Sequence, residues 1–277
     1  MQLRQRSIIS EHPLASYFVL AFLVSWAFAL PLLLSAVGAI PMKVSPYLHY
    51  AVLSGPLLSA VTVTAITKGR HGINSLLTKL IDFRIGVAWL FTAILSPIFV
   101  LALALLLLTL AGINMPGLAM VGRSSSLPGL GVAATVAVML IAAIEEEVGW
   151  RGFALPRLQA TRSALSSTIL LSLIWFAWHL PMFWYRPTFA SPTPFMFLGV
   201  FFGLLAGAII LTWLFNSTAG SLLAVVLWHG IWSSIAASDL GDLVPAVMSV
   251  LFMVWAIVIV VVFKRPDLSR SPRVTSI

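Results

Sequence analysis

Long apolar runs recur along the whole chain, and this feature most limits how it can fold. They cover about residues 14–39, 47–67, 87–111, 130–155, 164–184, 194–215, 219–237 and 243–263. About 20 helical residues cross a hydrocarbon layer about 30 Å thick. The sequence therefore predicts an all-α, polytopic membrane helix bundle with about eight transmembrane helices.

The composition agrees with a membrane protein and excludes several classes of site. Apolar residues make up 60% of the chain and charged residues 9%, and the mean hydropathy is +1.06, which excludes an ordinary soluble domain. We find no internal repeat and no separate soluble region, so residues 1–277 are predicted to form a single integral-membrane domain. The chain has no cysteine, which excludes disulfides, Cys-zinc sites and thiol nucleophiles.

The net charge of +8 reflects orientation in the membrane rather than binding of nucleic acid, because the basic residues lie between apolar runs and form no basic face. With eight spans, one side of the membrane carries Arg4, Arg6, Lys68, Arg70, Lys79, Arg84, Arg157, Arg162, Lys264, Arg265, Arg270 and Arg273. The other side carries only Lys43, Arg123 and Arg186. Positive charge favours the cytoplasmic side, so we expect a multi-pass protein of the cell membrane with both termini cytoplasmic.

The first apolar run, the basic segment 68–84 and the C-terminal residues each have a separate interpretation. The first apolar run is nearly twice as long as the apolar region of a signal peptide, about 7–15 residues, so it is interpreted as a retained span. Residues 68–84 are basic and amphipathic, which indicates a helix lying in the membrane interface. The polar residues 264–277 are predicted to be loose.

One acidic run stands out in the fourth span. Glu145, Glu146 and Glu147 are three of only eight acidic residues, and ionisable groups at membrane depth usually mark a functional site. Glu147 and Arg151 are four residues apart, in the favourable order for a helical ion pair. Glu146 lies about 100° further round the helix. We interpret Glu147 as held by Arg151 and Glu146 as available for chemistry, in a helix that ends at Pro156.

Two histidines, His179 and His229, fall inside other predicted spans, so one carboxylate and two imidazoles could meet in a buried pocket. A buried carboxylate can take a proton from water. Glu146, His179 and His229 are also a normal ligand set for a catalytic zinc, and histidines can alternatively donate to an oxyanion. Ser233, one turn after His229, could add a hydroxyl donor.

Several simpler interpretations remain open for the same residues. The acidic run could be a hydrated cap near a helix end, and each histidine could make an ordinary hydrogen bond between helices. Trp175 is interpreted as a packing or interfacial residue, and His12, His49 and His71 as interfacial. Gly149 and Gly230 would let neighbouring helices approach closely.

Three motifs, in order, resemble those of the CPBP intramembrane protease family, which includes type 2 CAAX prenyl proteases and bacteriocin-processing or abortive-infection proteins. They are Glu146-Glu147-x-x-x-Arg151, Trp175-x-x-x-His179 and His229-x-x-x-Ser233, within a motif core of about residues 140–236. The chain departs from the usual pattern in having Ser233 where Asn or Asp is common, and Trp175 where Phe is common.

The resemblance implies an intramembrane endopeptidase acting on a peptide or protein that enters from the lipid bilayer. The substrate could be a prenylated C-terminus, a leader peptide or a bacteriocin precursor. Glu146 would activate the hydrolytic water with help from His179, Glu147 and Arg151 would brace the site, and His229 with Ser233 would stabilise the oxyanion. The resemblance leaves both a zinc-dependent and a metal-free glutamate mechanism open.

Two other functions remain as alternatives. A non-catalytic membrane immunity or scaffold protein could have kept the protease fold, and Ser233 motivates this hypothesis. A proton-coupled transporter could use the glutamate and histidines as a relay, but the chain shows no repeat of the kind on which many transporters are built.

Overall fold

The chain folds into helices that follow the predicted spans closely. The computed structural model describes residues 8–114, 117–186, 193–263 and 266–277, and these contain helices and no strand. The helices are α1 (Ile8–Glu11), α2 (Pro13–Ala36), α3 (Leu48–Leu80), α4 (Val87–Leu110), η1 (Leu118–Met120), α5 (Val132–Gly149), η2 (Trp150–Ala154), α6 (Leu155–Gln159), α7 (Ala164–His179), α8 (Met182–Tyr185), α9 (Pro194–Ser217), α10 (Leu222–Ala236) and α11 (Leu243–Phe263).

The all-helical membrane fold predicted from the sequence is confirmed. Among the described residues, six segments are long and apolar enough to cross a membrane, corresponding to α2, α3, α4, α7 with α8, α9 and α11. The two remaining predicted spans are α10, which is apolar but has only 15 residues, and α5, which carries the three glutamates. The protein is therefore a multi-pass membrane protein, and the count of eight spans stays a prediction for α5 and α10.

Side-chain caps set the starts of three helices that build the site and its surroundings. Ser163 accepts a hydrogen bond from the Ser166 N–H at the start of α7, and Thr193 and Ser221 do the same for α9 and α10. Such caps satisfy backbone donors that a helix start leaves without partners. They explain why these helices begin at the polar residues between apolar runs.

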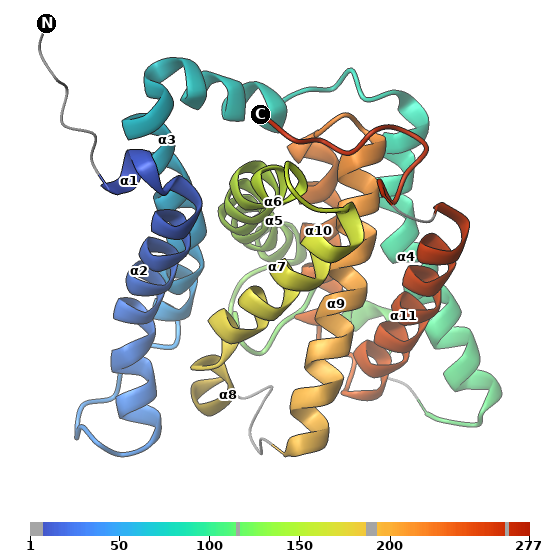
Figure 1. The fold of residues 1–277 in the computed structure, drawn as a ribbon. Helices are drawn as coiled ribbons and strands as arrows, with labels where there is room; N and C mark the ends of the chain where they lie inside the picture. The colour runs from blue at the N-terminus through green and yellow to red at the C-terminus, as the bar shows by residue number, and fades with distance from the viewer. Residues whose placement is uncertain (1–7, 115–116, 187–192, 264–265) are drawn as a thin grey trace, which may run out of the picture.

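The loops divide between the two ends of the bundle as the predicted topology requires. At one end, Lys79 Nζ donates to the Ala219 carbonyl over 2.7 Å. At the other, the Asp239 N–H donates to the Arg123 carbonyl over 2.9 Å. Figure 1 shows the start of α1 and the C-terminal segment at the same end. Arg4, Arg6, Lys264 and Arg265 lie outside the described residues, and the cytoplasmic assignment of this end stays a prediction.

Helix α3 turns sharply at Gly69, whose φ of +60° lies in the region that favours glycine. After Gly69 the helix runs across one end of the bundle (Figure 1). This direction agrees with the predicted amphipathic segment 68–84, in which Leu76 is buried and Leu77 is exposed.

The predicted loose tail is wrong for residues 266–277, which pack against the bundle. Gln159 and Asn216 are buried at the ends of α6 and α9 and hydrogen-bond each other. Gln159 Nε2 also donates to the Val274 carbonyl over 2.7 Å, and Asn216 Nδ2 to the Asp267 carbonyl over 2.8 Å. Because buried amides need partners, the backbone of the tail is held in place by these two side chains.

The helix with the acidic run lies in the interior. Helix α5 packs against both α3 and α10, and residues 146–156 are all buried. The predicted end at Pro156 is wrong. The backbone passes through a π-helical turn, η2, into α6, where Pro156 stands in the first turn. Proline has no N–H to donate to the preceding turn, so it stands where the π-helical turn gives way to α6.

Candidate active site

The two central glutamates of α5 point in different directions and have different partners. Glu147 is completely buried, and its Oε1 accepts a hydrogen bond from Arg151 Nη1 over 2.8 Å. Glu146 is also buried, and its Oε2 accepts a hydrogen bond from Trp175 Nε1 over 2.9 Å. The predicted pair between Glu147 and Arg151 is therefore confirmed, and Glu146 is left outside that pair.

Arg151 lies in the π-helical turn and is completely buried. Its guanidinium carbon lies 4.5 Å from the centre of the Trp175 ring, a distance at which the ring attracts a cation. The Trp175 ring and the Glu147 carboxylate both lie close to the Arg151 guanidinium. They stabilise a buried positive charge that would be unfavourable in lipid. A π-helical turn directly after two buried carboxylates is typical of a functional segment.

His229 connects α10 to the same ion pair. Its Nδ1 lies 2.7 Å from Glu147 Oε1. A carboxylate only accepts, so Nδ1 carries the hydrogen and Nε2 remains for another partner. The close approach of α10 to α5 depends on Gly230, because a Cβ there would lie 2.6 Å from Leu140 Cδ2.

His179 ends α7 and has the same arrangement of nitrogen atoms. Its Nδ1 donates to the Trp175 carbonyl over 2.8 Å, which again leaves Nε2 for another partner. Its ring centre lies 5.8 Å from the Trp175 ring centre, and the His229 ring centre lies 5.8 Å from it as well.

The structure therefore brings together the three side chains that the sequence placed on separate spans. Trp175 contacts all three of them: Glu146, His179 and His229. Their catalytic roles stay predictions. The alternative of a hydrated acidic cap does not fit Glu146 and Glu147, because both are buried.

Ser233 is half-buried one turn after His229, and the described residues provide no hydrogen bond to its hydroxyl. Its predicted role as an oxyanion donor stays a prediction. The neighbouring Ser234 hydroxyl donates to the Gly230 carbonyl within the helix, so it is already engaged.

Sequence reasoning missed the part played by Trp175, which it interpreted as packing or interfacial. The signal was its position four residues before His179, on the same face of α7. It also missed His49, interpreted as interfacial, which is buried with its Nδ1 3.0 Å from Tyr185 Oη.

A second missed residue is Tyr17 of α2, far outside the motif core. It is completely buried, and its ring stacks on Phe153 at 4.8 Å between centres. Its hydroxyl lies where a Cβ on Gly149 would be 2.5 Å away. Gly149 therefore permits the close approach of α2 and α3 to α5 that the sequence predicted.

The predicted zinc ligands are chemically suitable for binding a metal ion. Their side chains are not, however, grouped closely enough to bind one together. Each imidazole has Nδ1 engaged and Nε2 remaining, as is common for histidine ligands whose other nitrogen is oriented by a carbonyl or carboxylate. Among the described residues, however, no three His, Asp or Glu side chains are grouped so that they could hold a metal ion. Zinc binding by Glu146, His179 and His229 stays a prediction.

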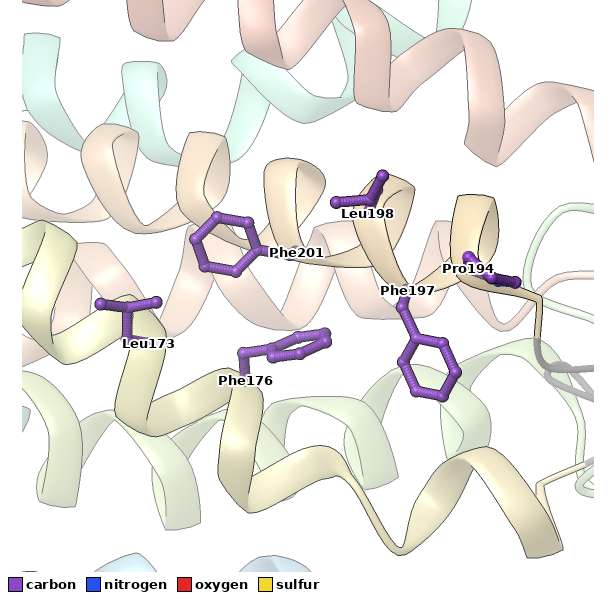
Figure 2. A pocket seen from close by; sticks show the side chains of 6 residues that line it. All are labelled: Leu173, Phe176, Pro194, Phe197, Leu198 and Phe201. Atoms are coloured by element: carbon purple, nitrogen blue, oxygen red, sulfur yellow. The ribbon is translucent and has the colours of Figure 1, made fainter.

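An apolar cavity lies on a different face of α7. It has a volume of about 470 Å³ and apolar walls from α7 and α9, lined by Leu173, Phe176, Pro194, Phe197, Leu198 and Phe201. Figure 2 shows Leu173 and Phe176 on α7 and the other four side chains on α9. None of the six predicted site residues lines it, so this cavity is separate from the candidate active site.

Comparison with known families supports the resemblance that the motifs indicated. Residues 128–235 match the sequence profile of the type II CAAX prenyl endopeptidase Rce1-like family. This part of the chain is similar to the Rce1-like family. The match contains all six predicted site residues and confirms the family resemblance carried by the three motifs.

A relative supports the same assignment over a shorter stretch. The CAAX prenyl protease 2 of Methanococcus maripaludis is 30% identical over 96 residues, which cover 33% of this chain and 35% of the relative. The chain thus matches about a third of the length of this relative.

Proposed function

We propose that this chain is an intramembrane endopeptidase in which Glu146 activates the water that hydrolyses a peptide bond. The observation that carries the proposal is the environment of Glu146. It is buried, one carboxylate oxygen is held by the Trp175 N–H, and two histidines lie on the same tryptophan ring.

The reaction begins with a proton transfer to Glu146. The oxygen not held by Trp175 takes a proton from water, and the hydroxide forms a bond to the peptide carbonyl carbon. His179 Nε2 has a lone pair, because Nδ1 carries the hydrogen, so it can accept the second hydrogen of the water and hold it in place. A general base in such a position typically contributes about 10²–10⁴-fold to the rate.

The tetrahedral intermediate then needs a hydrogen-bond donor for its oxyanion and a proton for its leaving nitrogen. A protonated His229 would donate from Nε2 to the oxyanion while Glu147 holds its Nδ1 hydrogen, and preorganised donors of this kind are usually a large contribution to catalysis. Glu146 passes its proton to the leaving nitrogen as the C–N bond breaks. Glu147 and Arg151 keep His229 in place and do not touch the substrate.

The name of the relative indicates a substrate class to test. CAAX motifs carry a prenylated cysteine three residues before the C-terminus. The pair of probes is therefore a farnesylated peptide ending in Cys and three further residues, and the same peptide without the farnesyl group. Processing of a bacteriocin precursor stays a prediction.

The experiment uses the purified full chain in lipid vesicles with both peptides, and mass spectrometry of the products. Wild type should cleave at least one of them, and Glu146→Gln should lower kcat/KM by about 10²–10⁴-fold without changing expression. His179→Ala should also abolish cleavage. Cleavage that survives both substitutions would overturn the mechanism. Zinc analysis of wild type, His179→Ala and His229→Ala checks the predicted ligands.

One observation favours a second candidate, a non-catalytic immunity or scaffold protein. Ser233 stands where the motif usually has Asn or Asp, and no described residue hydrogen-bonds its hydroxyl. Under this alternative, wild type cleaves neither peptide, and protection of cells or binding of a partner is the same for Glu146→Gln as for wild type.

A further inference from the structure

Trp175 contacts more of the candidate site than any residue that the motifs assign to chemistry. Its indole N–H donates to Glu146, its carbonyl accepts from His179, and its ring lies beside His229 and Arg151. It is buried on α7.

The hydrogen bond divides the two oxygens of Glu146. Because Oε2 is held at 2.9 Å by Trp175 Nε1, the carboxylate cannot turn freely about its last bond. The described residues give Glu146 no other side-chain hydrogen bond, so Oε1 remains for a water molecule. A donor to a carboxylate is one of the stronger hydrogen bonds in a protein interior.

We propose that Trp175 is a positioning residue whose indole N–H fixes the Glu146 carboxylate for catalysis. The inference rests on the proposed function and adds a requirement to it. The second motif commonly has Phe at this position, and a phenyl ring can pack against the imidazoles but has no N–H to donate. In this chain the orientation of the Glu146 carboxylate therefore depends on the indole N–H of Trp175, which the motif does not require.

The ring and the N–H have separable roles. The ring contacts fix the two histidines and Arg151 by packing, whereas the N–H acts only on Glu146. Replacing Trp175 by Phe removes the N–H and shortens the ring. Replacing it by a benzothienyl analogue, in which sulfur takes the place of the N–H, removes the donor at nearly constant shape.

Trp228→Phe is the matched control. Trp228 is buried on α10, next to His229 in sequence, but its ring packs on Phe252, and its Nε1 has no hydrogen-bond partner among the described residues. The substitution removes the same atoms from the same kind of environment without breaking a hydrogen bond to the acid.

The experiment measures kcat and KM for the better of the two peptides in vesicles. Trp175→Phe and the benzothienyl variant should each lower kcat by about 10- to 100-fold, the loss expected for a hydrogen bond to a charged group, with KM within about twofold of wild type. Trp228→Phe should leave both constants within about twofold. Melting temperatures establish that the variants are folded.

Three results would overturn the proposal. The first is a benzothienyl variant with the kcat of wild type. The second is an equal loss in Trp228→Phe. The third is a further loss when Trp175→Phe is added to Glu146→Gln, because residues that act through one another are not additive. Full activity of Glu146→Gln alone would instead contradict the proposed function, so the two failures are distinguishable.

Discussion

Helices α5 and α11 are both apolar and of similar length, yet they are buried in different ways. In α11 the buried residues form a single stripe, with Val244, Met248, Phe252, Ala256 and Ile259 on one face, and the other faces point outward. At the end of α5 every residue from 146 to 149 is buried. The difference shows where a membrane protein can keep charge. Protein surrounds the end of α5 at residues 146–149 and supplies hydrogen-bond partners, whereas most of α11 faces outward, where lipid would supply none.

The largest expected effect comes from breaking the buried ion pair of α5. Arg151→Met leaves the Glu147 carboxylate without its guanidinium, and removing one partner of a buried pair costs about 3–5 kcal/mol of stability. Thermal unfolding in detergent should show a large loss. The double variant Glu147→Gln with Arg151→Met should recover part of it, and an unchanged melting temperature for Arg151→Met would contradict the role of the pair.

A smaller effect should follow from adding one methyl group to α5. At Gly149 a Cβ would lie 2.5 Å from Pro56 Cβ, so Gly149→Ala should destabilise the protein by about 1–3 kcal/mol. Gly199 of α9 is the matched control, because a Cβ there meets nothing within 4 Å. Gly199→Ala should be neutral or stabilise the helix by up to about 1 kcal/mol. Equal melting temperatures for the two variants would show that α5 is no more tightly packed than α9.

The smallest effect is expected on the outward face of α11. Val254 is 54% exposed, and lipid tails are as apolar as the side chain. Val254→Ala should therefore change stability by less than about 0.5 kcal/mol and leave peptide cleavage unchanged. A loss comparable to that of Gly149→Ala would mean that this face of α11 contacts protein.

Much of the fold was predictable because hydropathy reports directly on the bilayer. The predicted run 243–263 and helix α11 have the same bounds, since lipid imposes a length on an apolar helix. The ends of α5 were less predictable. The π-helical turn and the placement of Pro156 depend on contacts of η2 with other helices, and no local pattern specifies those.

The candidate site was predictable as a set of residues but not as an arrangement. The spacing of Glu147 and Arg151 predicted their pair, because neighbours on a helix meet at that spacing. The hydrogen bond from Trp175 to Glu146 joins residues 29 positions apart, and the C-terminal contacts of Gln159 span more than a hundred. Such pairings depend on tertiary packing. From the sequence, Trp175 could be identified only as an aromatic residue four positions before His179.

Tyr17 has a practical consequence for protein engineering. A chimera that transplants residues 128–235 into another membrane scaffold would carry every motif and still lack the phenol ring that stacks on Phe153 from α2. The host would have to supply an aromatic side chain that packs on Phe153. It would also need Pro56 of α3, or a substitute, beside Gly149. The smallest transferable unit is therefore the motif region together with the first two long helices.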